Sequence, residues 1–184
     1  INADLFYQVP HLIAPGETLA STEHNRGLGG KGANMSVATA RAAARSVHIG
    51  AVGPDGRWAV DRLTEYGVDT RHISEVAQPT GHAVIMVDPG GENAILLFPG
   101  ANQAITETHI SQALSEATET DTFLFQNETS AQVEGATLAS TKGMRVVYAA
   151  APFDAGAVQA VLPLLDLLVM NAVEAQQLTE AMGI

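Results

Sequence analysis

A glycine-rich segment at residues 27–34 reads Gly-Leu-Gly-Gly-Lys-Gly-Ala-Asn. It runs into an alanine-rich stretch, residues 33–45, that predicts a helix because alanine is the best helix former and nothing interrupts it. Glycines at the start of a helix let the backbone approach a ligand and surround it with N–H groups at the positive end of the helix dipole. The segment therefore predicts a ligand-binding loop.

The charge of the chain limits its partners. Its 184 residues include 9 lysines and arginines against 20 aspartates and glutamates, which gives a formal net charge of -11. Such a chain repels polyanions, so we expect neither nucleic acid nor an anionic membrane surface as a partner. The hydrophobic share of 46% is enough for a globular domain with a core.

Several absences narrow the chemistry further. The chain has no cysteine, which excludes disulfides, thiolate metal sites and cysteine nucleophiles, and its six histidines lack the paired spacing of a metal site. It has no apolar run of about 18 residues and no signal-type beginning. We therefore expect a soluble, cytoplasmic protein. Because the chain begins with isoleucine and stops just after a predicted helix, we also expect both ends to be incomplete.

Alternating apolar strands and helices predict an α/β fold. Strands are expected at residues 47–53, 122–127, 144–150 and 164–171, and helices at residues 33–45, 57–66, 131–141 and 173–182, with Thr106 capping one more. Turn-forming residues predict two hairpins, one around Pro15-Gly16 and one around residues 89–91. Antiparallel pieces thus interrupt a mainly parallel pattern.

The glycine segment fits two phosphate-binding motifs only in part. Asn25 stands where a Walker A loop begins with glycine, and Gly32 follows the lysine where that loop has Ser or Thr. Residues 27–32 do fit G-x-G-x-x-G, but this dinucleotide motif follows a buried apolar strand, and residues 18–26 are polar. A dinucleotide site stays an alternative, as does a loop that only lets a helix pack closely on a sheet.

Short motifs spread along the chain resemble the ribokinase family of carbohydrate kinases. Asn-Ala-Asp at residues 2–4 and Gly-Gly-Lys-Gly-Ala-Asn at residues 29–34 carry most of the resemblance. Further matches follow in family order at residues 15–18, 50–55, 66–70, 79–81, 91–93, 99–102 and 171–175. Together they cover essentially the whole chain, which makes the resemblance more specific than any single glycine motif.

The resemblance implies a three-layer α/β core with a mainly parallel sheet and a small antiparallel β lid that closes over a sugar. It places residues 1–184 in a single, partial domain with lid segments at about residues 4–28 and 79–100, in agreement with the two hairpins. Family members are commonly homodimers through their lids. The apolar runs of the second hairpin would suit such an interface, or burial within one subunit.

The resemblance also implies which residues bind the sugar. Asn2 and Asp4 would bind hydroxyl groups, and Glu128 would accept one more. The loop residues Gly30, Lys31, Gly32, Ala33 and Asn34 would wrap the sugar with backbone and side-chain donors. Judged from the residues alone, Asp4 and Glu128 could equally be solvated surface carboxylates.

Asn171 and Glu174 match the Asn-x-x-Glu motif with which the family orders magnesium and the nucleotide phosphates. The resemblance makes Asn171 a nucleotide-binding residue and Glu174 a metal-binding residue. An ordinary helix cap, in which the two side chains satisfy backbone N–H groups, is the alternative. The sequence also departs from the family, with Ala172 in place of an acidic residue and Ala-Ala-Ala-Pro at residues 149–152.

The family's catalytic base is an aspartate in a Gly-Ala-Gly-Asp motif, which has no counterpart in residues 1–184. We expect it, with most adenine-site and K⁺-site residues, in a missing C-terminal part. The resemblance implies an ATP- and Mg²⁺-dependent phosphotransferase, activated by K⁺, that converts D-ribose to ribose 5-phosphate. The alternatives are a kinase for another sugar or nucleoside, such as fructose, a keto-deoxy sugar acid or adenosine, and a truncated sugar-binding module without catalysis.

Overall fold

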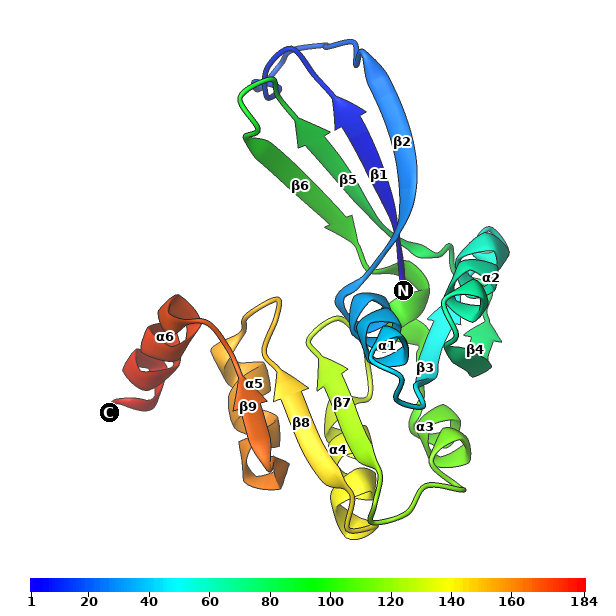
Figure 1. Cartoon of the computed structure of the whole chain (residues 1–184). Helices are drawn as coiled ribbons and strands as arrows, with labels where there is room; N and C mark the ends of the chain where they lie inside the picture. Colours follow the sequence, from blue (N-terminus) through cyan, green and yellow to red (C-terminus); the bar gives the residue numbers. More distant parts are fainter. The chain divides into compact units, whose positions relative to one another are not determined.

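The computed structural model describes all residues from 1 to 184 and divides into two compact units (Figure 1). The first unit is Ile1–Ala104 and the second is Ile105–Ile184. Four of the six strand pairings are parallel and two are antiparallel, which confirms the mixed α/β class. None of the helices is both long enough and apolar enough to cross a membrane.

Strands dominate the first unit. Its elements in chain order are β1 Asn2–Gln8, β2 Glu23–Gly29, α1 Lys31–Arg41, β3 Val47–Val52, α2 Arg57–Glu65, β4 Asp69–Glu75, β5 Gly81–Val87, β6 Asn93–Phe98 and the 3₁₀ helix η1 Gly100–Ala104.

A four-stranded sheet in the order β2-β1-β5-β6 contains both predicted hairpins (Figure 1). β1 and β2 are antiparallel, as are β5 and β6, and a parallel pairing between β1 and β5 joins the two hairpins into one sheet. Asn2 consequently lies between Gly29 of β2 and Gly81 of β5. β2 begins at Glu23 and takes in Gly27 and Gly29 of the glycine-rich segment.

α1, α2 and the parallel pair β3-β4 form the rest of this unit. The core cluster includes Ala33 of α1 and Ala59 and Leu63 of α2, all fully buried, together with Val52 at the end of β3. Alanines let the backbones of packed elements come close together. The predicted strand at 47–53 and helix at 57–66 are present almost at their predicted bounds.

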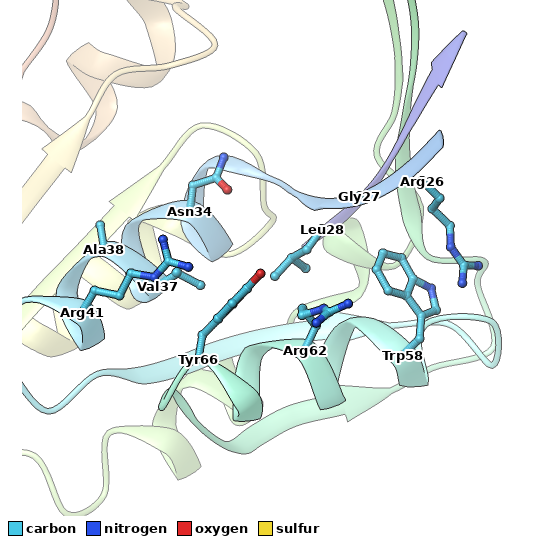
Figure 2. Close-up of a pocket in the computed structure, with 10 residues that line it drawn as sticks. All are labelled: Arg26, Gly27, Leu28, Asn34, Val37, Ala38, Arg41, Trp58, Arg62 and Tyr66. Carbon is cyan, nitrogen blue, oxygen red and sulfur yellow. The ribbon is translucent and has the colours of Figure 1, made fainter. Parts of the chain in front are cut away.

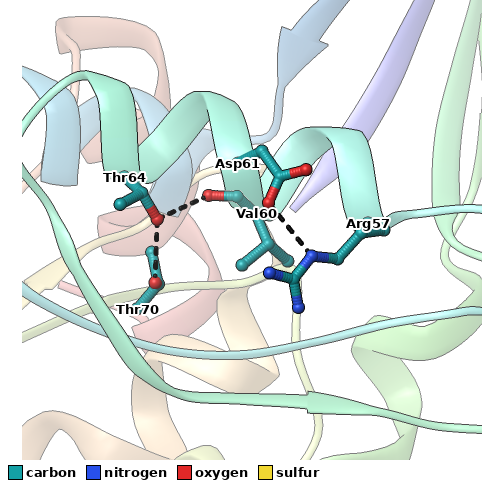
Figure 3. Close-up of polar contacts among 5 residues, drawn as sticks. All are labelled: Arg57, Val60, Asp61, Thr64 and Thr70. Atoms are coloured by element: carbon teal, nitrogen blue, oxygen red, sulfur yellow. Dashed lines mark hydrogen bonds and ion pairs between the residues drawn. The ribbon is translucent and has the colours of Figure 1, made fainter.

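Hydrogen bonds of α2 side chains connect this helix to β4 and link residues along its exposed face (Figure 3). The Thr64 hydroxyl donates to the Val60 carbonyl at 3.0 Å and lies 3.0 Å from the Thr70 hydroxyl in β4. Arg57 donates to Asp61 at 3.0 Å, one turn further along the helix. The Arg57 guanidinium is thus engaged in an ion pair with Asp61 on the surface of α2.

α1 begins at Lys31 and ends at Arg41, and the predicted span of 33–45 therefore lies too late. Ala43 just beyond the helix has a φ of 62°, a left-handed conformation that cannot continue a helix. On the side facing β3, the Ser36 hydroxyl lies 2.8 Å from Nδ1 of His48. Burial lowers the pKa of His48 to about 3, so this histidine is neutral in the folded protein.

The second unit alternates helices and strands. Its elements are α3 Glu107–Ala113, β7 Thr122–Gln126, α4 Gln132–Thr141, β8 Arg145–Ala149, α5 Ala155–Val161, the 3₁₀ helix η2 Leu162–Leu164, β9 Leu167–Val169 and α6 Ala172–Met182.

Its three strands form a parallel sheet in the order β7-β8-β9, as expected when helices connect successive strands. Thr106 caps α3 as predicted, because its side chain accepts a hydrogen bond from the His109 amide at 3.2 Å. Tyr148 of β8 is fully buried, and its ring lies 4.6 Å from that of Phe125 in β7. The carboxyl ends of these strands carry the polar segments that follow.

Candidate active site

The glycine loop turns the chain from β2 into α1 at Gly30, which is the N-cap residue of α1. Gly30 has a φ of 92°, which a residue with a side chain rarely adopts, and a Cβ atom there would lie 2.9 Å from the Asn2 nitrogen. No side chain caps α1 at this end. The first-turn amides of α1 therefore lie at the positive end of the helix dipole, where a ligand can use them.

The Asp4 carboxylate lies directly over Gly29. A Cβ atom on Gly29 would overlap the carboxylate carbon and both of its oxygens. The pairing of β1 with β2 produces this approach, because Asp4 is opposite Gly27 and its side chain reaches along the strand to Gly29. The structure thus brings Asp4 and the glycine loop together, and only glycine fits at position 29.

Asn2 is held in place by a buried residue of another motif. Asn102, which is 2% exposed, donates from Nδ2 to Oδ1 of Asn2 at 2.8 Å and to the Ile1 carbonyl at 3.0 Å. The Ile1 nitrogen in turn donates to Oδ1 of Asn102 at 2.8 Å. These bonds fix the Asn2 side chain and leave its own Nδ2 without a hydrogen-bond partner. Asn2 can therefore donate to a ligand from a preset position.

Sequence reasoning missed the part played by Asn102. The residue belongs to the Pro-Gly-Ala-Asn motif at residues 99–102, which contributes to the family resemblance without any role of its own. The only local hint of its role is that Asn102, a polar residue, directly follows Gly100 and the apolar Ala101. Its position behind Asn2 depends on a contact about 100 residues away in sequence and could not be found from local pattern.

A second buried contact holds the turn before α2. Thr80 is 1% exposed, and its amide and hydroxyl both donate to Oδ1 of Asp55 at 2.9 Å. The Thr80 hydroxyl also accepts from the Gly53 amide at 2.9 Å. The hydrogen bond from the Thr80 amide lowers the pKa of Asp55. Asp55 and Thr80, which also lie in matched motifs, thus connect this turn to the start of β5.

The other predicted sugar-binding residues of this unit lie along the first turn of α1. Lys31 and Gly32 are half-buried, Ala33 is fully buried in the core and Asn34 is exposed. The Ala33 side chain packs inward, so only its backbone can serve a ligand. Asn34 begins the helical hydrogen bonding, since its amide donates to the Gly30 carbonyl at 3.0 Å.

Glu128 belongs to the second unit and follows β7. It is half-buried, in a segment that polar contacts hold at the carboxyl ends of β7 and β8. Asn127 donates from Nδ2 to the Pro152 carbonyl at 3.0 Å, and Gln132 donates to Asn127 Oδ1 at 3.0 Å. Ligands of open parallel sheets bind at this edge of the strands.

Asn171 and Glu174 form a capping box at the start of α6. Asn171 Oδ1 accepts from the Glu174 amide at 2.9 Å, and Glu174 Oε2 accepts from the Asn171 amide at 2.8 Å. The helix cap that the sequence allows as an alternative is therefore present. Glu174 Oε1 makes no hydrogen bond, so one carboxylate oxygen stays available to a cation.

No group of three or more His, Cys, Asp or Glu side chains in the chain could hold a metal ion. Magnesium bound with a nucleotide needs no such group, because it keeps several waters and takes one or two carboxylates together with phosphate oxygens. A single open carboxylate oxygen on Glu174 fits that kind of site. It does not fit a metal site made by protein ligands alone.

Comparison with known proteins decides the family. The family model of pfkB family carbohydrate kinases matches residues 1–183. The chain belongs to this family. Two curated members are similar to it: the ribokinase of Haemophilus influenzae, 37% identical, and that of Staphylococcus aureus, 33% identical, both over 184 residues and 97% of the chain. The chain spans 60% of the length of each.

Solved pfkB-family structures have the same fold. Ribokinase from Cryptococcus neoformans in complex with ADP matches 99% of this chain and 57% of its own, with a TM-score of 0.85 and 33% identity. Arabidopsis thaliana ribokinase complexed with ribose and ATP matches 97% of this chain and 60% of its own, with a TM-score of 0.86 and 28% identity. The family resemblance drawn from the sequence motifs is confirmed.

Proposed function

We propose that this protein is an ATP-dependent sugar kinase that transfers the γ-phosphoryl group to the 5-hydroxyl of D-ribose. The observation that carries the proposal is the Asp4 carboxylate, which is held over Gly29 beside the uncapped start of α1. A polyol needs acceptors and donors in fixed directions, and this arrangement places both together. The similarity to ribokinases, one of them in a complex with ribose and ATP, supports ribose as the acceptor.

In this proposal each loop residue has a defined task. Asp4 accepts hydrogen bonds from two sugar hydroxyls, and Asn2 donates from its unpartnered Nδ2. The backbone of residues 30–34 and the Lys31 and Asn34 side chains wrap the sugar. Glu128 accepts one more hydroxyl. The segments at about 4–28 and 79–100 act as a lid of a single domain, and their closure excludes water from the phosphoryl transfer.

The nucleotide part of the proposal rests on α6. Asn171 would face the phosphates, and the open oxygen of Glu174 would hold Mg²⁺, directly or through water. Mg²⁺ neutralises charge on the transferring phosphoryl group. K⁺ activation is part of the proposal by family resemblance. The catalytic aspartate and the adenine site are expected in the part of the family's length that this chain does not span.

The proposal includes a cytoplasmic homodimer that associates through the four-stranded sheet. The exposed apolar side chains of β6 support it: Ile95, Leu96 and Leu97 are 57%, 70% and 49% exposed. Ile95 and Leu97 lie on one face of this edge strand and Leu96 on the other, so both faces of β6 expose aliphatic side chains of the kind that marks protein interfaces. The sequence left open whether this run is buried within one subunit, and its exposure favours the interface.

A coupled assay of ADP release with the full-length protein tests the proposed function. We expect turnover with D-ribose to exceed turnover with fructose, a keto-deoxy sugar acid and adenosine by at least about 100-fold in kcat/KM, since unpaired polar groups in a site reject analogues strongly. Preference for another acceptor would overturn the substrate assignment. Absence of ADP release with every acceptor would overturn the kinase assignment.

A sugar-binding module without catalysis is the second candidate. Binding of a sugar by Asn2, Asp4 and residues 30–34, which all lie in the first unit, does not in itself require phosphoryl transfer. The intact mass of the natural protein separates the two candidates. A mass near 19.2 kDa, which is that of these residues alone, would support the module, and a mass larger by more than half would support the kinase.

A further inference from the structure

The strand β6 forms one free edge of the four-stranded sheet (Figure 1). Its residues, Asn93–Phe98, read Asn-Ala-Ile-Leu-Leu-Phe and include neither a charged side chain nor a proline. The opposite edge of the same sheet is β2, which carries Glu23 and Arg26. Charged side chains and prolines protect the free edge of a sheet from pairing with another strand. β2 has this protection, whereas β6 has none.

The hairpin between β5 and β6 shows which backbone groups of β6 point away from the sheet. The Asp88 amide donates to the Glu92 carbonyl at 3.0 Å, so these two residues form a hydrogen-bonded pair. Hydrogen-bonded pairs alternate with pairs that are not hydrogen-bonded along an antiparallel ladder. In the observed register Asn93, Ile95 and Leu97 belong to the second kind of pair. Their N–H and C=O groups therefore point outward, away from β5.

The free edge is short and centred on Ile95. The outward positions that come next along the chain are Gly91 and Pro99, one on each side. The Gly91 amide already donates to the Asp88 carbonyl within the turn, and proline has no amide hydrogen. Asn93, Ile95 and Leu97 are exposed, and their outward groups have no hydrogen-bond partner in the chain. Three residues thus offer both a donor and an acceptor to a further strand.

A second copy of the chain fits this edge in one register. When two β6 strands lie antiparallel with Ile95 opposite Ile95, Asn93 of each copy lies opposite Leu97 of the other. All outward groups then pair, which gives about six hydrogen bonds between the copies. A shift of the strands by two residues leaves one residue of each copy unpaired. Such a contact is the same on both copies and closes as a dimer.

Charge and side-chain exposure favour a second copy as the partner. Two copies with a net charge of -11 repel each other, so their contact must be free of charge, and β6 carries none. In this register the Ile95 side chains are neighbours on one face of the sheet, and the Leu96 side chains are diagonal neighbours on the other face. Pairing at the edge therefore covers aliphatic side chains on both faces of β6. Packing of one sheet face on another would cover those of one face only.

We propose that two copies of this protein pair β6 with β6 as antiparallel neighbours, in the register centred on Ile95, and so join their four-stranded sheets into one continuous sheet. The pairing specifies the contact within the homodimer and rests on that part of the proposed function. It requires neither ribose nor ATP, so the kinase assay and the tests of the pairing have independent outcomes.

Single-cysteine variants of the full-length protein test the register, since residues 1–184 contain no cysteine. Ile95→Cys should form a disulfide-linked dimer under mild oxidation, because the Cα atoms of directly opposed residues lie about 5.5 Å apart, within reach of a disulfide. Leu97→Cys is the matched control, on the same face and similarly exposed, at 49% against 57% for Ile95. It should not link to itself, because its two copies lie four residues, or about 14 Å, apart.

Co-expression of Asn93→Cys with Leu97→Cys should give a linked dimer, although neither variant should link to itself. Mass spectrometry of the linked peptides identifies the two positions. A protein that is dimeric in light scattering but does not link through Ile95→Cys would overturn the strand pairing and not the homodimer, because packed sheet faces lie about 10 Å apart, beyond the reach of a disulfide. A monomeric protein would overturn both.

Ile95→Pro tests the hydrogen bonds between the copies without a new thiol. The Ile95 amide points away from β5, so proline at this position removes no hydrogen bond within the sheet. One hydrogen bond is lost from each copy at the centre of the contact, and we expect the dimer to dissociate at least about tenfold more readily in analytical ultracentrifugation. Ile95→Val keeps the amide hydrogen and should associate as the unmodified protein does. Equally tight dimers of the two variants would overturn the proposal.

Discussion

Gly29 is the position where the proposed sugar site tolerates least change. In Gly29→Ala the new methyl group would overlap the Asp4 carboxylate, and Asp4 must move away from the loop. We expect ribose binding, measured by calorimetry, to weaken at least about tenfold, because a displaced acceptor loses its charge-assisted hydrogen bonds to the sugar.

Gly27→Ala is the matched control, two residues earlier in the same strand. A Cβ atom at Gly27 meets only the Phe6 ring, at the ordinary contact distance of 3.7 Å. Ribose affinity should therefore stay close to that of the unmodified protein. If both variants bind ribose normally, Asp4 is not a sugar ligand.

His48 gives the first unit a specific dependence on pH. Its pKa is about 3 in the folded protein and about 6.5 in an unfolded chain, so the unfolded state binds its proton first as the pH falls. The contribution of neutral His48 to the free energy of unfolding is therefore complete above pH 6.5 and is lost progressively as the pH falls below it. Between pH 7 and pH 5 the loss from this residue should be about 2 kcal/mol in the free energy of unfolding.

Urea unfolding at both pH values measures this effect. His48→Gln should lose about that part of the pH dependence, whatever its stability at pH 7. His24→Gln, which changes an exposed histidine, should keep the full dependence. An unchanged difference between pH 7 and pH 5 in His48→Gln would show that the buried histidine does not resist protonation.

The first turn of α6 has two roles that one substitution can separate. In Glu174→Gln the side-chain oxygen still accepts the Asn171 amide, so the helix should keep its cap and the melting temperature should change little. The carboxylate charge is lost, and we expect kcat/KM for MgATP to fall about 10- to 100-fold, as changes around a metal usually do. Asn171→Ala is the opposite case and should cost about 1 kcal/mol of stability. If kcat/KM for MgATP is unchanged in Glu174→Gln, the Glu174 side chain only caps α6 and does not hold Mg²⁺.

Local sequence signals predicted those elements that local chemistry determines. The hairpins follow from their turns, α3 from Thr106, and α6 from Asn171 and Glu174. β4, by contrast, is a polar edge strand without the apolar alternation that reveals a strand, and sequence analysis did not find it.

Contacts between segments that are far apart in the chain could not be predicted from the sequence. The parallel pairing of β1 with β5 and the bonds from Asn102 to Asn2 join residues that local patterns treat separately. The same is true of a groove between α1, α2 and the end of β2 (Figure 2), which is lined by residues as far apart in sequence as Arg26, Arg41 and Arg62. The motif resemblance identified Asp4 and the glycine loop as neighbours in function, whereas their contact through Gly29 required the strand register.

For the whole molecule, the exposed β6 strand predicts the state of association. Leu96→Glu places a charge in the middle of the proposed interface and should convert a dimer to a monomer in light scattering after gel filtration. Val173→Glu is the control, because Val173 is almost as exposed, at 65%, but lies on α6. A protein that is monomeric without any substitution, or a dimer that survives Leu96→Glu, would contradict association through this sheet.

The place of β1 in the sheet also affects when the protein can begin to work during its synthesis. β1 is an inner strand, and its parallel partner β5 is not complete until Val87 has been made. Asn2 depends on Asn102 as well, which is made later still. A chain emerging from the ribosome thus exposes Asp4 and the glycine loop long before their supports exist, since pairings between distant segments form last. Ribose affinity should appear in nascent chains only after Asn102 has left the ribosome.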